Sequence, residues 1–246
     1  MAAIIAMSRN RVIYCHDADL TLDGRVADPN LAFDPVDVTT FEEDAHRNNP
    51  GLQMNSFVYT GLYEDSAQRS YQTIKDMLDG KLARVVSVFF NGDGSGSVGY
   101  GLPGAYANMA FSGGPGEAEE VEGAFTQDGT KHQVVSIVAK GEVTTNSTSG
   151  TYDRGAGATT TAGGAMYVHI FTNESSGGNT DWIVRLQDAT TATGVYSDFA
   201  SLTVGSGTTL GTAIEVTGTF NRFVRVTRVL DADSGTLEAQ VGFVAH

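Results

Sequence analysis

The chain has 246 residues, of which 41% are hydrophobic and 18% are charged, and 30 are glycine. This composition is typical of a globular chain with many turns, and it favours an all-β fold with a sizeable core. Acidic residues outnumber basic ones by 29 to 15, and the net charge of −14 disfavours proteins that hold nucleic acids or anionic membranes through phosphate contacts.

The chain opens with a predicted pair of strands at residues 11–16 and 18–22, followed by a turn signal. Cys15 lies in the first strand, and without a constellation of activating residues we expect its thiol to be packed in the core. Because it is the only cysteine, the sequence excludes an intramolecular disulfide and a multi-cysteine metal site, and it fits assembly in a reducing cytoplasm. No apolar run predicts a membrane span.

Two prolines divide the next part of the chain into short segments at residues 31–33 and 36–41. A polar, acidic loop follows. Residues 53–63 then alternate as a half-buried strand does, with Phe57 and Tyr59 on one face. A compact domain normally has no such long solvated loop, so we expect this loop to contact another molecule.

One helix is predicted over residues 66–79, where the apolar residues recur at helical spacing and form a single stripe. Ser66 is a suitable cap, and Gly80 ends the helix. The stripe consists of Ala67, Tyr71, Ile74 and Leu78. Residues 84–90 form a continuous apolar run, which predicts a buried central strand.

Glycines at positions 94, 96 and 99 match the spacing of a dinucleotide-binding loop. Such a site requires a helix to start there, and the Gly- and Pro-containing residues 100–104 do not supply one. Residues 91–96 also match the start of a calcium-binding loop, but Leu102 stands where the bidentate glutamate belongs. We therefore expect a Gly-rich hairpin.

Residues 105–111 and 121–125 are predicted to pair as strands, and residues 132–139 to form a further strand. Between the first two lies an acidic run, which is expected to be a solvated face. A glycosidase pair would instead require two of these carboxylates in an aromatic cleft. The run contains Glu117, Glu119, Glu120 and Glu122.

Residues 141–164 are rich in Thr, Ser and Gly, which predicts a linker between residues 1–140 and a second unit at residues 165–246. Alternation in the second unit predicts strands at 166–171, 182–187, 199–204, 213–216, 220–229 and 237–244. Trp182 is expected in the core of this unit, and stacking on a sugar is the alternative that we keep open for it.

The second unit also holds the only basic cluster of the chain, Arg222, Arg225 and Arg228. Their spacing splits them between the two faces of a strand, so they do not form one phosphate-binding stripe. The histidine spacings indicate no metal site, and no serine, histidine and aspartate arrangement indicates a catalytic set. The sequence therefore predicts neither a cofactor nor an enzyme.

Short motifs at residues 37–41 and 51–63, followed by a short helix, resemble the major tail tube protein of long-tailed bacteriophages. Motifs at residues 162–169, 181–187, 196–203, 218–225 and 240–246 are similar, in that order, to the C-terminal domain of many such proteins. Two departures stand out. The chain has an acidic loop at residues 42–49 where the family often has a Gly-rich turn, and His246 where arginine is more familiar.

The resemblance implies a tail tube β-sandwich flanked by one helix, with a second β-sandwich on the tube exterior. Six copies would form a ring by joining sheets, and the rings would stack into a tube that conducts DNA without binding it. The implied partners are copies of the chain itself, the tape measure protein, and the terminator or baseplate proteins. The implied location is the virion tail, assembled in the host cytoplasm.

Two groups of residues are predicted to serve this assembly. The acidic loop is expected to contact a neighbouring copy or ring, and its candidate residues are Thr39, Phe41, Glu42, Glu43, Asp44, His46, Arg47, Asn48 and Asn49. The acidic run at Glu117, Glu119, Glu120 and Glu122 is expected to line the bore, where carboxylates repel phosphates over a screening length of roughly 8 Å.

Two other classes of protein remain open at this point. A carbohydrate-binding β-sandwich module or surface adhesin would use Trp182 and neighbouring aromatic residues. An enzyme would require a carboxylate pair within residues 117–122 in a cleft.

Overall fold

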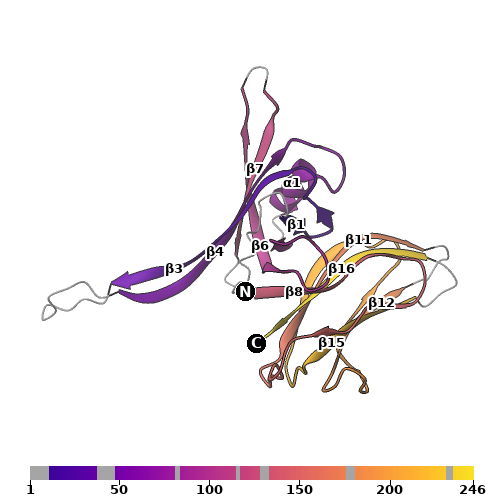
Figure 1. Ribbon diagram of the computed structural model, residues 1–246. Coiled ribbons are helices and arrows are strands. Elements are labelled where there is room, and N and C mark those ends of the chain that lie inside the picture. The colour runs from indigo at the N-terminus through magenta and orange to yellow at the C-terminus, as the bar shows by residue number, and fades with distance from the viewer. Residues whose placement is uncertain are drawn as a thin grey trace, which may run out of the picture.

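The computed structural model describes residues 11–37, 48–80, 84–114, 117–127, 133–175, 181–230 and 235–246. Its described residues form antiparallel strands and one short helix, so the prediction of an all-β fold is confirmed (Figure 1). The first half contains β1 Val12–Cys15, β2 Ala18–Asp19, β3 Gly24–Asp37, β4 Asn48–Leu62, α1 Ser70–Gly80, β5 Arg84–Phe89, β6 Val98–Ser112, β7 Glu120–Gln127 and β8 Gln133–Val143. The second half contains β9 Ser147–Thr148, β10 Tyr152–Asp153, β11 Gly164–Ser175, β12 Trp182–Ala189, β13 Ser197–Val204, β14 Leu210–Val216, β15 Phe223–Leu230 and β16 Gly235–Ala245.

The long strand β6 belongs to two parts of the larger sheet. Its first residues pair with β5 and β8, whereas residues 105–112 pair with β7, which in turn pairs with β4 and then β3. The sheet of the first half thus folds over a core that includes Phe57, Tyr59 and Phe125, all fully buried. Cys15 lies in this core, where burial raises the pKa of its thiol, and the predicted packed cysteine is confirmed.

The second half is a sandwich of two sheets around Trp182. One sheet has the order β10-β15-β12-β13, and the other contains β14, β11 and β16. In β12 the alternation is as predicted, because Trp182, Val184 and Leu186 are buried while Ile183 and Arg185 are less so. In β15 the arginines divide between faces, since Arg228 is buried and Arg225 lies on the outer side.

The larger sheet crosses the predicted boundary between the two units. Strand β8 pairs with β16, so that Val143 lies opposite Leu237, and the path continues to β11 and β14. A cluster that includes Tyr14, Phe89 and Tyr167 draws side chains from both halves. The division into two units stays a prediction, but the described residues of the predicted linker pair with the sheets of the structure.

The helix begins at Ser70, and the prediction that it begins at residue 66 was wrong. Gln68 has a left-handed backbone (φ 60°), which interrupts a helix. The cap comes from elsewhere in the chain: Oδ2 of Asp23 accepts a hydrogen bond from the Ser70 amide at 3.2 Å. Ala67, expected in the apolar stripe, is exposed, whereas Ile74 is buried.

Strand β3 is one long strand, and the predicted division into segments at 31–33 and 36–41 was wrong. Pro29 and Pro35 both lie inside it. In this sheet β3 pairs only with β4 among the described residues. An edge strand tolerates proline because its outer amides need no ladder partner.

Candidate assembly surface

A two-stranded arm projects from the first half (Figure 1). Strands β3 and β4 pair along their whole length, from Gly24 opposite Gly61 to Asp37 opposite Asn48. Strand β7 supports only residues 56–62 of β4, so residues 48–55 have β3 as their one ladder partner in the described chain. Eight extended residues span about 27 Å.

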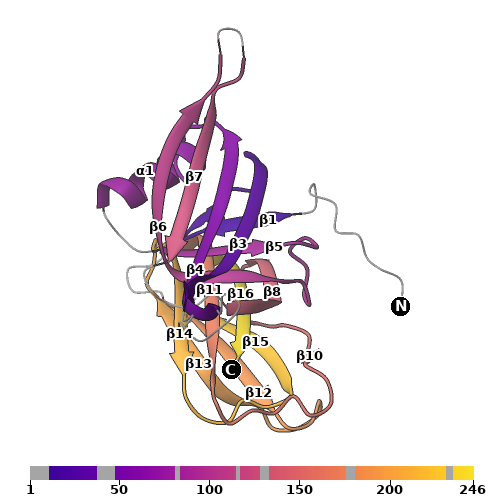
Figure 2. The ribbon, with the colours of Figure 1, turned by 90° about the vertical axis from the view of Figure 1, so that its left-hand side faces the viewer.

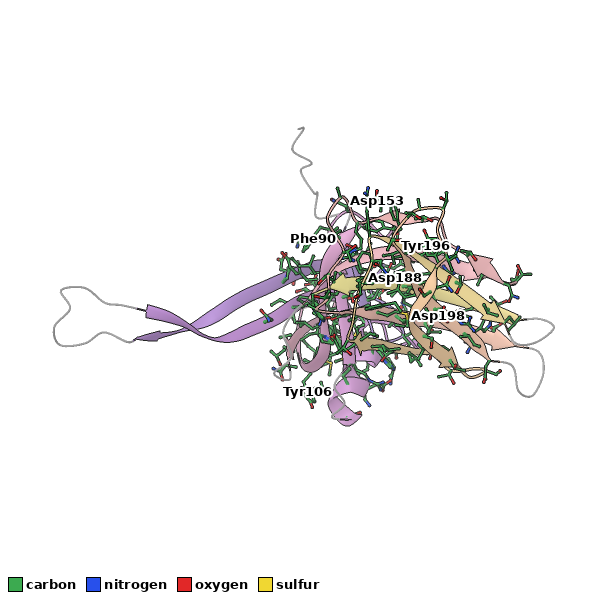
Figure 3. All side chains as sticks on the ribbon, turned by 90° about the horizontal axis from the view of Figure 1, so that it is seen from below. Phe90, Tyr106, Asp153, Asp188, Tyr196 and Asp198 are labelled. Atoms are coloured by element: carbon green, nitrogen blue, oxygen red, sulfur yellow. The ribbon has the colours of Figure 1, made fainter. Side chains whose placement is uncertain are left out.

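Such an arm has an energetic consequence. A two-stranded hairpin is marginally stable in water by itself, because it has no second layer on which to bury its side chains. Figure 3 shows the arm from below, extending away from the body of the molecule. The arm is therefore the part of the fold that gains most from a contact with another molecule.

Only two of the nine predicted contact residues belong to the described part of the chain. Thr39, Phe41, Glu42, Glu43, Asp44, His46 and Arg47 lie outside the described residues. Asn48 and Asn49 begin β4, where they lie opposite Asp37 and Val36. Their role in assembly stays a prediction.

The four strands β3, β4, β7 and residues 105–112 of β6 form a sheet with two free edges. Within the described chain, the outer edge of β3 and the edge of residues 106–112 of β6 have no ladder partner. Every neighbouring pair in this sheet is antiparallel. If β6 of one copy lay beside β3 of the next, the alternation of strand directions would continue unbroken. Free edges of this kind are templates for pairing with another chain.

One face of this sheet is open to solvent and carries two of the predicted bore acids. Glu122 is exposed in the row that contains Thr60 and Ala110. Glu120 is on the same face and forms an ion pair with Arg25. The same face also exposes the apolar side chains of Val26, Val58, Leu62 and Tyr106, and no basic stripe runs along the described part of it.

The other two predicted bore acids lie outside the sheet. Glu117 and Glu119 are exposed in the loop between β6 and β7. The Glu117 carboxylate accepts a hydrogen bond from the Gly114 amide at 3.1 Å, which orders that turn. The sequence run thus divides between a sheet face and a loop, and a common lining role for all four stays a prediction.

A polar cluster joins the two halves. Nδ1 of His169 donates to the backbone oxygen of His16 at 2.7 Å, and Ser87 Oγ lies 3.0 Å from Nε2 of His169. Burial lowers the pKa of His169 to about 4, so the ring is neutral at pH 7. The Gly211 amide donates to Nδ1 of His16 at 2.8 Å. Ser87 and His169 are both fully buried, so a substrate has no access to this pair, which acts as a structural contact.

The described residues offer neither a metal-binding group nor a membrane-spanning helix. No group of three or more His, Cys, Asp and Glu side chains in the described residues is placed to hold a metal ion. Among those residues no helix is long and apolar enough to cross a membrane. Trp182 is fully buried in the core of the second half, so it has no face on which a sugar could stack.

Comparisons with known proteins give structural likenesses only. No family model matches the chain, and no curated protein is similar to it in sequence. The fold is similar to a chain of the virion of a native gene transfer agent particle, with 15% identity over 50% of this chain and 95% of that one, at a TM-score of 0.41. A chain from the tail of the empty particle, solved with C6 symmetry, has 16% identity, the same coverage and a TM-score of 0.37.

A further likeness covers almost all of the chain. The Dit protein of SPP1, described as a hub of the adsorption apparatus in phages that infect Gram-positive bacteria, has 12% identity over 96% of this chain and 99% of its own, at a TM-score of 0.34. All three TM-scores are below 0.5, so the function of this chain has to be argued from its own residues.

Proposed function

We propose that this chain is a structural subunit of a bacteriophage tail, in which six copies form a ring and the rings stack into the tube that conducts DNA. The proposed location is the virion, after assembly in the host cytoplasm. The sequence resemblance to major tail tube proteins suggested this role. The observation that carries the proposal is the β3–β4 arm, because a two-stranded hairpin about 27 Å long without a second layer requires a neighbour.

Ring formation is supported by the two free edges of the four-stranded sheet. Pairing of β6 with β3 of the next copy is a head-to-tail contact, which uses different surfaces on the two copies. Such contacts close into a ring when a whole number of rotations between copies makes a full turn. A sheet closed into a barrel has no edge strand left. The open face that carries Glu120 and Glu122 would then line the bore.

Charge supports a conduit for DNA. The chain has a net charge of −14, and the open face exposes Glu122 without a basic stripe beside it in the described residues. A wall of this kind repels the phosphates of a duplex, so that DNA passes without specific binding. The tape measure protein and the terminator or baseplate proteins are proposed partners on the strength of the sequence resemblance. This structural role requires neither a cofactor nor catalysis.

The proposal is tested by replacing the arm. Residues 31–55 are exchanged for Asn-Gly, which joins Asn30 to Ser56 by a two-residue hairpin turn. The body of the first half keeps its other strands, so we expect a circular dichroism spectrum that still shows a folded β-protein, with less strand signal, and rings that no longer stack. Negative-stain microscopy of the purified chain and of the variant distinguishes tubes, single rings and monomers.

A shorter replacement locates the contact. Joining Asp37 to Asn48 by Asn-Gly removes residues 38–47, with seven of the nine predicted contact residues, and keeps the paired stem. Loss of tubes in both variants places the contact within residues 38–47, whereas tubes from the shorter variant place it on the stem. Val195→Ser, at a residue 94% exposed in the second half, is the surface control. Normal tubes from the armless variant would contradict the role of the arm in stacking, a natural chain that stays monomeric would contradict the proposed function, and rings of the natural chain that never stack would favour a hub.

A carbohydrate-binding module is the competing function, and the structure removes its main support. The single tryptophan is fully buried between the two sheets of the second half. A module of this kind would remain monomeric under conditions in which the natural chain forms rings.

A further inference from the structure

Three aromatic side chains form an exposed group where α1 meets the end of the sheet. We call this group, Tyr63, Tyr71 and Phe111, the aromatic patch. The ring centroid of Tyr71 lies 4.9 Å from that of Tyr63 and 5.9 Å from that of Phe111, and the centroids of Tyr63 and Phe111 are 6.4 Å apart. Phe111 is 51% exposed and Tyr63 39%. Aromatic side chains bury large areas in protein interfaces, and a group of them left partly exposed indicates a surface that another protein covers.

The aromatic patch borders the free edge of β6. Phe111 has the same strand parity as the buried Ala107, so it lies on the core-facing side of the sheet, beside α1. Phe111 lies opposite Val121 of β7, and Val121 lies opposite Gly61 of β4. Gly61 in turn lies opposite Gly24, the first residue of β3. The aromatic patch and the start of β3 are therefore at the same level on opposite edges of one sheet.

A cavity of about 260 Å³ lies at that opposite edge, between β1 and β3. We call it the edge cavity; its lining includes Ile13, Thr21 and Ala27. Like the aromatic patch, it is on the core-facing side of the sheet, because Ile13 belongs to the core of the first half. Leu22, next to the lining residue Thr21, is 79% exposed, whereas the exposed Val26 lies opposite Thr60 and so faces the open side of the sheet. Figure 2 shows α1 and β6 on one side of the first half and β1 and β3 on the other.

The two surfaces also differ in charge. The charged neighbours of Tyr63 in the aromatic patch include Asp65, Glu119 and Glu64. The edge cavity has Arg11 and Arg25 in its lining, with side chains 30% and 53% exposed. Each arginine is already paired within the chain, with Asp28 and Glu120 respectively, and its exposed part still faces solvent. Carboxylates against guanidinium groups favour one orientation of two copies over the reverse.

We propose that the aromatic patch of one copy packs into the edge cavity of the next copy, and that this contact forms the lateral joint of the ring. The proposal rests on the proposed function, and it adds which surfaces meet. In a flat sheet Phe111 would face Gly24 of the neighbour. Closing the sheets into a barrel shifts neighbouring strands along their length, so Phe111 would meet β3 at a point displaced from Gly24. The lining of the edge cavity includes residues 24–28 of β3 and so extends along this direction.

Disulfide trapping tests the joint directly. The double variant Phe111→Cys with Thr21→Cys places one thiol in the aromatic patch and the other in the lining of the edge cavity, too far apart for a bond within one chain because the two surfaces lie on opposite edges of the sheet. Cys15 is fully buried and contributes no background. After mild oxidation we expect a ladder of covalent oligomers, up to six chains, on a non-reducing gel.

Matched variants serve as controls. Each single cysteine variant gives no dimer, since a head-to-tail joint does not bring identical residues together. Phe111→Cys with Val195→Cys has two exposed thiols and gives no ladder, because Val195 lies in the second half. In a second measurement Phe111→Ala weakens ring formation at least tenfold in protein concentration, while Val134→Ala, at a residue equally exposed (52%), does not.

The outcomes separate the two proposals. Rings without the ladder, together with normal rings from Phe111→Ala, overturn the joint and leave the tail-tube function standing. A natural chain that stays monomeric overturns the function and the joint together. The armless variant keeps the aromatic patch and the edge cavity, so it should still give the ladder.

Discussion

The two halves of the molecule differ in how far their surface groups are paired within the chain. In the second half the outer polar groups bind one another: Arg225 lies 4.0 Å over the Tyr196 ring and donates to Gln187, which donates to Asp198. Among the described residues, the first half instead carries an arm in which residues 48–55 have β3 as their one ladder partner, and an exposed aromatic patch. Edge strands occur in both halves, since β13 and β14 also end their sheets, so it is the unsupported arm and the aromatic patch that favour the first half as the proposed assembly surface.

The largest expected effect tests whether the two halves are one folding unit. Trp182→Ala removes the largest side chain of the second core, and Phe57→Ala is its counterpart in the first core. Each is expected to lower the free energy of unfolding by about 3–5 kcal/mol. Because β8 pairs with β16 and a third cluster joins the halves, urea unfolding of both variants should be a single transition. Two transitions, each sensitive to one variant, would show that the halves unfold separately.

A smaller effect concerns the polar contact between the halves. The pKa of His169 falls from an ordinary 6.5 to about 4 in the folded chain, because burial disfavours the charged ring. The unfolded chain therefore binds the extra proton between pH 6.5 and pH 4, and stability is lost as pH falls through this range. The expected loss attributable to His169 is about 3 kcal/mol.

His169→Gln isolates this contribution. The variant should be less stable at pH 7 but should lose less stability than the natural chain between pH 7 and pH 4. His246→Gln is the control, since His246 is an exposed histidine at the C-terminal end of the described chain. Equal pH profiles for the natural chain and His169→Gln would show that this histidine does not weaken the junction in acid.

The smallest effect on stability is expected on the open face of the first half. Glu122→Lys changes an exposed side chain, so the free energy of unfolding should change by no more than about 0.5 kcal/mol. In assembled particles the added lysines would attract DNA phosphates, and genome ejection should slow in a salt-dependent manner. Glu117→Lys, in the loop, is the comparison. Unchanged ejection from Glu122→Lys particles would remove this residue from the bore.

Strands with strong local patterns were predictable from the sequence, and long-range contacts were not. Residues 182–187 alternate cleanly, and the structure places a strand there with Trp182 inside. The helix start was misplaced because its cap, Asp23, is far away in the chain, and because Gln68 adopts a left-handed conformation that no sequence signal announces.

The candidate surface shows the same limit. The sequence predicted that the loop after residue 41 contacts another molecule. It did not predict the strand that forms the stem of the arm, because Pro29 and Pro35 are unusual inside a strand. Only tertiary structure brings Tyr63, Tyr71 and Phe111 together, because Tyr63 follows β4, Tyr71 is in α1 and Phe111 is in β6. Alternation marks Phe111 as core-facing, and its exposure follows from its place at the sheet's edge.

The ladder between β8 and β16 has a mechanical consequence. Its hydrogen bonds run across the strands from Leu237 opposite Val143 to Phe243 opposite Ser136. A force that pulls the second half along these strands loads many bonds in shear at once, instead of stretching a flexible tether. A force on the second half is thus transmitted to the sheet of the first half, and the second half keeps a fixed angle to that sheet.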